Sequence, residues 1–598
     1  MPEYNAPVRD MKFVMQELLD CETHYQSLGY EDATPDMIDA IMGEAAKFTE
    51  EVIAPINQIG DEQGCTWNDG EVTTPDGFKE AYQQYVEGGW PTLSQPIEFG
   101  GQGLPHSLNT AIGEFSSAAN HSFAMYPGLS HGALATLDAH GTEEQKAMFM
   151  PKLVEGTWTG TMCLTEPHCG TDLGMLRTKA EANEDGSYSL TGTKIFISAG
   201  EHDLSDNIVH IVIARIPGSP EGTKGISLFI VPKFNVTADG EKAERNGVTC
   251  GSIEHKMGIN ANATCVINFD GAKGYLIGEV NRGLNCMFTF MNAARLGVAN
   301  EGVAAAEASF QGALAYAKDR LQMRSLTGPK NPSGPADPII VHPDVRRMLL
   351  TQKSIAEGGR ALNSYLGQLV DIVEVGTDPA QVAEANSKLA LLTPIAKAFL
   401  TELGLECTSH GVQVYGGHGF IKEWGMEQLM RDTKISCLYE GTTGIQALDL
   451  LARKILGSKG ELIKPFAAEV TEFCTQTITD EQMSEFIKPM ITIAPNWQKM
   501  TQEIGMKAMK NPNEIGAASV DYLMYSGYLT LAYFWAKMAK VAFDKLAEGT
   551  DEKAFYEAKI KTARFYFARI LPRIHGHAAC IENGADSMMA HDEEEFMI

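Results

Sequence analysis

A single carboxylate, Glu440, stands at a break between two stretches with helical spacing. Apolar residues recur on both sides of it: Ile435, Leu438 and Tyr439 before, and Ile445, Leu448, Leu451 and Ile455 after. The Gly-Thr-Thr-Gly step that follows Glu440 therefore predicts a stop, a turn and a new helix.

The residue types at this turn suit a general base. Gly441 would leave room for a bound molecule beside the backbone, and Thr442 or Thr443 would cap the next helix. Apolar neighbours disfavour the charged form of a carboxylate, so they would raise the pKa of Glu440 and strengthen it as a base. The alternative is an ordinary solvated acid, since a glycine just past a helix end is common.

A second group of polar residues lies between Met162 and Asp172, in the run Met-Cys-Leu-Thr-Glu-Pro-His-Cys-Gly-Thr-Asp. Thr165 and Thr171 offer hydroxyl groups that could reach the edge of a flat heteroaromatic ring. Pro167 and Gly170 favour a loop whose backbone amides stay available. The pattern predicts either a binding loop or a simple turn.

A third group is the run Lys-Ile-Phe-Ile-Ser-Ala-Gly over residues 194–200. Phe196 could stack on a ring system and Ser198 could donate a hydrogen bond to it. Core packing of a strand explains the same residues equally well.

Length and composition describe the kind of chain that carries these groups. With 598 residues, 44% hydrophobic and 21% charged, it should form about four globular units, and no apolar run approaches the roughly 18 residues of a membrane span. The amino terminus shows no basic segment followed by an apolar one, so we expect a cytoplasmic protein. Eleven cysteines without a C-x-x-C pair predict reduced thiols and no metal site. The net charge of −29 argues against nucleic-acid binding.

The pattern of apolar residues divides the chain into four predicted domains. Residues 1–159 are helical, with amphipathic runs over 11–19, 35–53 and 107–137. Residues 160–280 carry short β-branched runs at 188–191, 208–214, 226–231 and 264–269, which favour a small barrel or sandwich over a parallel sheet. The fold class is therefore α+β multidomain.

The carboxy-terminal half is predicted to be helical. Residues 281–459 hold four long runs, 291–323, 344–375, 381–415 and 445–456, that would form a bundle carrying Glu440. A loop rich in proline and glycine, 326–338, interrupts them and must run over the surface. Residues 460–598 form an added helical domain whose many aromatic residues we interpret as packing.

These motifs, in this order, resemble the acyl-CoA dehydrogenase family over about residues 1–456. The family carries Thr-Glu-Pro with Gly-Ser/Thr-Asp, an aromatic-Ile-Thr/Ser strand, Gln-x-x-Gly-Gly-x-Gly and Tyr-Glu-Gly-Thr. The third of these is the run from Gln413 to Gly419 here. Phe196 replaces the more usual Trp and Thr171 the more usual Ser, and both replacements keep the chemistry.

The resemblance implies a set of site residues. FAD would be bound by Met162, Thr165, Gly170, Thr171, Phe196, Ile197, Ser198 and Thr442. The FAD nucleotide of a neighbouring subunit would be held by Arg320, Gln413, Gly416 and Gly417, which implies a homodimer or tetramer. The acyl-CoA substrate would lie against Thr171, Arg295, Tyr439 and Gly441.

The resemblance also implies a reaction. Glu440, ordered by the nearby Arg295, would remove the α-proton of an acyl-CoA thioester while the β-hydrogen leaves as hydride to flavin N5, which gives the trans-2-enoyl-CoA. An electron-transfer flavoprotein would accept the electrons. Within the family, the extra carboxy-terminal domain is similar to that of long members acting on 3-(methylthio)propanoyl-CoA, which yields 3-(methylthio)acryloyl-CoA.

Three alternatives share this fold. An acyl-CoA oxidase would pass its electrons to oxygen, and a short- or medium-chain fatty acyl-CoA dehydrogenase would differ only in the acyl pocket. A DNA-associated flavoprotein would need a basic carboxy-terminal domain, whereas residues 460–598 hold more acids than bases.

Overall fold

The computed structural model describes residues 2–598, which form two compact units. One unit is Glu44–Gly297, and the other combines the residues up to Gly43 with Val298–Ile598. Helices α3 (Pro35–Phe48) and α9 (Gly283–Asp319) contain the unit boundaries. No helix among the described residues is long and apolar enough to cross a membrane.

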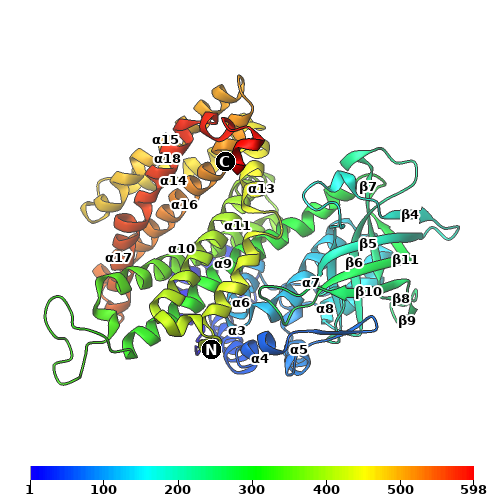
Figure 1. Cartoon of the computed structure of the whole chain (residues 1–598), viewed down its shortest axis with the longest axis horizontal. Coiled ribbons are helices and arrows are strands. Elements are labelled where there is room, and N and C mark those ends of the chain that lie inside the picture. Colours follow the sequence, from blue (N-terminus) through cyan, green and yellow to red (C-terminus); the bar gives the residue numbers. More distant parts are fainter. Residues whose placement is uncertain (1) are drawn as a thin grey trace. The chain divides into compact units, whose positions relative to one another are not determined.

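The unit Glu44–Gly297 contains a closed sheet (Figure 1). Its ring runs through β11 (Thr264–Ile277), β5 (Tyr188–Ser198), β4 (Lys179–Ala182), β6 (Asn207–Arg215) and β7 (Ile226–Pro232), which pairs back with β11. Strands β10 (Val248–Ile253) and β3 (Trp158–Cys163) extend it, and β8 (Phe234–Val236) and β9 (Lys242–Arg245) form a separate hairpin. Most pairs in the ring are antiparallel, so the predicted barrel is confirmed.

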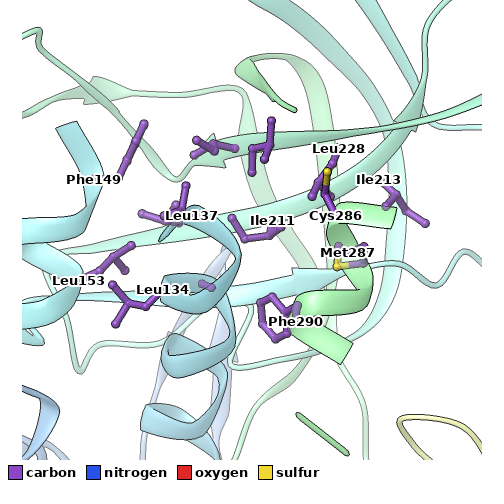
Figure 2. Close-up of a cluster of buried hydrophobic side chains, with 14 of the residues drawn as sticks. Leu134, Leu137, Phe149, Leu153, Ile211, Ile213, Leu228, Cys286, Met287 and Phe290 are labelled. Atoms are coloured by element: carbon purple, nitrogen blue, oxygen red, sulfur yellow. The ribbon is translucent and has the colours of Figure 1, made fainter. Parts of the chain in front are cut away.

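Alternation along β6 and β7 explains why these strands are apolar throughout. Ile211 and Leu228 face a core shared with the helices, whereas Val212 and Phe229 face the barrel interior. Successive side chains of a strand point to opposite faces, so a strand covered on both faces needs apolar residues at every position. Figure 2 shows the first of these cores, with side chains from both strands and from the start of α9.

Helices α7 (His121–His140) and α8 (Glu143–Glu155) cover this core. They follow α4 (Asn57–Gln63), α5 (Phe78–Glu87) and α6 (His106–Ala119), and α4 and α6 pack against α7. Asn120 caps α7 by accepting from the amide of Phe123 at 3.0 Å, and Thr142 with Gln145 forms a capping box on α8. These capping residues fix where α7 and α8 begin. The apolar periodicity alone had predicted α6 and α7 as one continuous run over 107–137.

The amino-terminal domain is mainly helical, as predicted, but it also contains a hairpin that the sequence analysis missed. Strands β1 (Thr66–Asn68) and β2 (Glu71–Thr73) form a hairpin around Asp69 and Gly70, whose φ angles are 48° and 89°. An Asp-Gly pair with both φ angles positive is a strong signal for a two-residue hairpin turn, but the strands are too short to show a clear alternation.

The other unit is a helical assembly around α9, α10 (Pro343–Val375), α11 (Pro379–Tyr415) and α13 (Thr443–Leu448), which continues as a π-helical stretch to Leu456. These helices match the four predicted for the bundle. The short helices α1 (Val8–Lys12), α2 (Cys21–Ser27) and α12 (Met426–Lys434) belong to the same unit.

The added carboxy-terminal helices share a core with the bundle. They are α14 (Lys464–Thr477), α15 (Ser484–Ala508), α16 (Asn513–Glu548), α17 (Lys553–Phe565), α18 (Ile574–Asn583) and α19 (Asp586–Met589). On α16, Trp535 is buried and donates to the carbonyl of Ser354 on α10 at 3.0 Å. The prediction that the aromatic residues serve packing is confirmed, since Tyr522, Tyr525 and Tyr533 are buried as well.

Candidate active site

Glu440 lies on the predicted turn, between the 3-10 turn Ile435–Cys437 and α13. Its φ of 54° and the φ of 94° at Gly441 place two successive residues in the left-handed region. A non-glycine residue rarely adopts this conformation, so the turn must be held by its surroundings.

Three hydrogen bonds hold the turn. Gln446 donates from Nε2 to the carbonyl of Glu440 at 2.8 Å, and the buried Lys397 on α11 donates from Nζ to the carbonyl of Gly441 at 2.8 Å. Thr442 caps α13 by accepting from the amide of Ile445 at 3.4 Å. The hydrogen bond from Lys397 is strong because its donor is charged. Our sequence analysis did not identify Lys397 as part of the site.

Tyr439 ties the turn to α9. Its hydroxyl donates to Oε2 of Glu301 at 2.5 Å, and the hydroxyl of Ser436 donates to the same atom at 2.7 Å. Burial and, after it, the negative charge of Glu301 raise the pKa of Tyr439 well above its ordinary value. The phenol therefore stays protonated, and its hydroxyl is engaged with Glu301.

Four predicted nucleotide-binding residues gather at one end of the same unit. The rings of Tyr316 on α9 and Tyr415 on α11 stack at 4.1 Å, which brings together the helix ends that carry Arg320 and Gln413. Arg320, Gln413, Gly416 and Gly417 are all exposed. Gly416 has a φ of 60°, and a Cβ at either glycine would meet nothing within 4 Å. A cation beside open glycine backbone fits an anionic nucleotide.

In the unit with the barrel, the structure brings the second and third motifs together. The amide of Ile195 on β5 donates to the carbonyl of Thr165 at 2.9 Å. Gly170 and Thr171 are exposed on the loop that follows, whereas Met162 on β3 is partly buried. We call residues 162–172 the flavin loop after the role predicted for them, because their hydroxyls and amides suit the polar edge of a flat ring.

Phe196 stands out from β5 beside this loop. Phe196 lies at a bulge between β5 and β11, has a φ of 58° and is 59% exposed. An exposed aromatic ring in a constrained backbone suits stacking on a heteroaromatic group. Ile197 is buried in the barrel core, so only its backbone is available to a ligand, whereas Ser198 is partly exposed.

Glu166 and Lys194 form a buried ion pair that the sequence analysis missed. Lys194 donates from Nζ to Oε1 of Glu166 at 2.9 Å and to the carbonyl of Leu164 at 3.0 Å. Burial alone would raise the pKa of Glu166, but Lys194 and hydrogen bonds from the Thr178 hydroxyl and the Arg177 amide lower it. The pair fixes the flavin loop against β5. The sequence did hold a clue to this pair, because one of the two predicted motifs contains an acid, Glu166, and the other contains a base, Lys194.

The same carboxylate belongs to a possible metal cluster. Ligand atoms of Glu166, His168 and Cys169 lie within 4.8 Å of one another. Both oxygens of Glu166 already accept hydrogen bonds, and the ammonium of Lys194 would repel a cation. We therefore interpret these three residues as stabilising the loop and not as metal ligands.

Arg295 is buried in the part of α9 that belongs to the barrel-containing unit. Glu440 belongs to the other unit, so the predicted action of Arg295 on Glu440 stays a prediction. Thr442 is exposed at the start of α13.

Comparison with known families accounts for most of the chain. The matching descriptions are "Acyl-CoA dehydrogenase, N-terminal domain" over residues 36–157, "middle domain" over 161–272 and "C-terminal domain" over 281–456. Residues 466–592 match "Acetyl-CoA dehydrogenase C-terminal like".

Individual relatives match over nearly the whole length. The 3-methylmercaptopropionyl-CoA dehydrogenase of Ruegeria pomeroyi is 41% identical over 98% of this chain and 99% of its own length. A butyryl-CoA dehydrogenase of Syntrophomonas wolfei is 34% identical over 99% of both chains. The crystal structure of a Bacillus anthracis acyl-CoA dehydrogenase complexed with FAD has the same fold, with a TM-score of 0.75 at 22% identity over 92% of this chain and 89% of that one.

Proposed function

The chain belongs to the acyl-CoA dehydrogenase family, whose members are oxidoreductases acting on CH–CH bonds, and we propose that Glu440 is its catalytic base. The substrate is a short acyl-CoA thioester and the product is the trans-2-enoyl-CoA. The observation that carries this proposal is a carboxylate held on a left-handed turn by Gln446 and Lys397. Catalytic groups are often held in such constrained backbone.

FAD is the cofactor, and it supplies the acceptor for two electrons when bound. The flavin loop and Phe196 offer hydroxyls, amides and an exposed ring for the flavin. Arg320 and the exposed glycines Gly416 and Gly417 suit the nucleotide end of the cofactor of a second subunit in a homodimer.

The carboxylate of Glu440 takes the α-proton of the thioester. The charge that develops on the thioester oxygen needs hydrogen-bond donors, and the backbone amide of Glu440 is one of them. Lys397 and Gln446 keep the turn from relaxing as this charge moves. The family resemblance implies a role for Arg295 in ordering the carboxylate, and this role stays a prediction.

The relative from Ruegeria pomeroyi supports 3-(methylthio)propanoyl-CoA as the substrate and 3-(methylthio)acryloyl-CoA as the product. An electron-transfer flavoprotein accepts the electrons. Eleven free cysteines favour a reducing compartment, the cytoplasm.

The test compares Glu440→Gln with the parent enzyme by anaerobic bleaching of the flavin with short acyl-CoA thioesters. The variant should keep its flavin and lose bleaching by roughly 10³-fold or more, because an amide cannot accept the α-proton. Glu423→Gln, which changes an exposed acid on a neighbouring turn, should bleach at the parent rate. A Glu440→Gln enzyme that bleaches normally would reject the assigned base. Admitting air to the reduced parent enzyme separates a dehydrogenase, which reoxidises slowly, from an oxidase.

A further inference from the structure

Lys537 on α16 is a partly buried cation that has no acid to pair with. Among the described residues, no hydrogen bond or ion pair reaches its amine. Two other partly buried lysines nearby in the fold or on the same helix do have carboxylate partners: Lys388 contacts Glu469 at 2.7 Å, and Lys540 contacts Asp544 at 2.6 Å. Removing an ammonium group from water without a counter-charge is costly, so the unpaired state of Lys537 calls for an explanation.

The acid that attracts Lys537 is already occupied by other groups. This acid is Glu469 on α14. Tyr365 and Lys388 donate to its Oε2, each at 2.7 Å, and Tyr533 donates to its Oε1 at 2.8 Å. Burial alone would raise the pKa of Glu469, but these donors lower it. A carboxylate accepts about four hydrogen bonds, and the amine of Lys537 does not supply the fourth.

An aromatic wall stands beside the amine of Lys537. Its Nζ lies 5.4 Å from the centre of the Tyr533 ring, four residues earlier on α16. Phe466 and Phe473 on α14 pack against Tyr533 in T-shaped contacts, each with 5.7 Å between ring centres. A tyrosine ring attracts a cation only weakly compared with a carboxylate. These rings therefore take the place of water beside Lys537 without supplying a counter-charge.

The charges around Lys537 leave its ammonium form disfavoured. Burial lowers the pKa of Lys537, and the nearby cation of Lys388 lowers it further, whereas Glu469 opposes them without restoring the ordinary value. An ordinary lysine with a pKa near 10.4 is neutral in only roughly one molecule in 2,500 at pH 7. Lys537 therefore holds more of the neutral amine, which is the nucleophilic form of the side chain.

We infer that Lys537 is a site of covalent acylation by short acyl-CoA thioesters. The neutral amine attacks the thioester carbonyl, the C–S bond breaks and an amide bond forms. The proton that the amine loses passes to the departing thiolate, which leaves as free coenzyme A. No electrons are transferred, so the step needs no flavin and no further reactant. Acylation also removes the cation that Lys388 repels.

The inference goes beyond the proposed function and does not depend on the role of Glu440. Members of the acyl-CoA dehydrogenase family act on acyl-CoA thioesters, so an enzyme of this family meets this class of acylating agent wherever it works. Acylation at Lys537 would be a reaction of the thioester carbonyl, whereas the proposed function changes the α- and β-carbons. The two reactions can therefore be measured separately.

The test incubates the flavin-loaded, full-length enzyme with acetyl-CoA at neutral pH and follows acyl occupancy at each lysine by peptide mass spectrometry. Acetyl-CoA has no β-carbon, so dehydrogenation cannot consume it. Lys540 is the matched control within the same chain, because it lies on the same helix with 31% of its side chain exposed but is paired with Asp544. Lys537 should be acylated roughly threefold faster than Lys540 or more, since more of its amine is neutral.

Two variants test the physical cause. Lys388→Met removes the repelling cation and leaves Glu469 to act on Lys537, so the ratio of acylation at Lys537 to that at Lys540 should fall towards one. Lys464→Met, which changes an exposed lysine on α14, should keep the parent ratio. If Lys388→Met does not fold, the comparison of the two lysines within the parent chain decides the question by itself.

Each result bears on one proposal. Equal rates of acylation at Lys537 and Lys540 would overturn the inference and leave the proposed function standing. A ratio that stays at the parent value in a folded Lys388→Met enzyme would overturn it as well. Selective acylation of Lys537 in a flavin-loaded enzyme that oxidises no acyl-CoA would support the inference and reject the proposed function.

Discussion

Gly441→Ala should disable the enzyme while leaving it folded. A φ of 94° costs an L-residue roughly 1–2 kcal/mol. The new Cβ would also lie 2.7 Å from Nε2 of Gln446, the group that donates to the carbonyl of Glu440, and losing that bond costs roughly 1 kcal/mol. The turn would therefore relax by moving Glu440. A displacement of about 1 Å at a catalytic group costs roughly 10²-fold in rate.

The assay is the anaerobic rate of flavin bleaching at saturating substrate, with flavin content and urea unfolding measured on the same samples. Gly444→Ala is the matched control three residues along. It lies in α13, and its Cβ would meet nothing within 4 Å, so the change should raise stability by up to about 1 kcal/mol and leave the rate unchanged. The reasoning fails if Gly441→Ala bleaches within twofold of the parent, or if both variants slow equally.

Two further predictions concern buried charge away from this turn. Lys559 on α17 is buried between the carboxylates of Asp10 and Glu357, so Lys559→Met should lower the free energy of unfolding by about 3 kcal/mol in urea titrations. The control, Lys561→Met on the exposed face of the same helix, should change it little. Equal effects of the two substitutions would contradict the prediction. Burial alone would raise the pKa of Asp337, but hydrogen bonds from the amides of Ser325, Lys330 and Asn331 lower it to about 2. The loop 326–336 should therefore resist proteolysis above about pH 4 and lose that resistance as the pH falls through 2. A cleavage rate by an acid-stable protease that stays the same over this pH range would contradict the prediction.

Local patterns in the chain were enough to predict the helices of the bundle, four strands of the barrel and the turn at Glu440. Periodicity reports which face of an element is buried, and the Gly-Thr-Thr-Gly step reports where a helix must stop, so neither needs knowledge of distant residues. The motifs also identified the family. The hairpin at Asp69 and Gly70 shows the limit of this approach, because two three-residue strands give too short a pattern to stand out from the helices around them.

The partners of buried polar groups came only from the tertiary structure. Lys397 looks like one charge in an apolar helix, and nothing near it in sequence points to the carbonyl of Gly441. Lys194 and Glu166 are likewise 28 residues apart, and Gln95 and His131 are 36 apart. A buried donor takes whichever acceptor the packed elements bring within 3 Å, and that choice depends on strand register and helix packing over the whole unit. Local sequence thus predicted the carboxylate that we propose as the base, whereas the groups that hold its turn are selected by the packing of the whole unit.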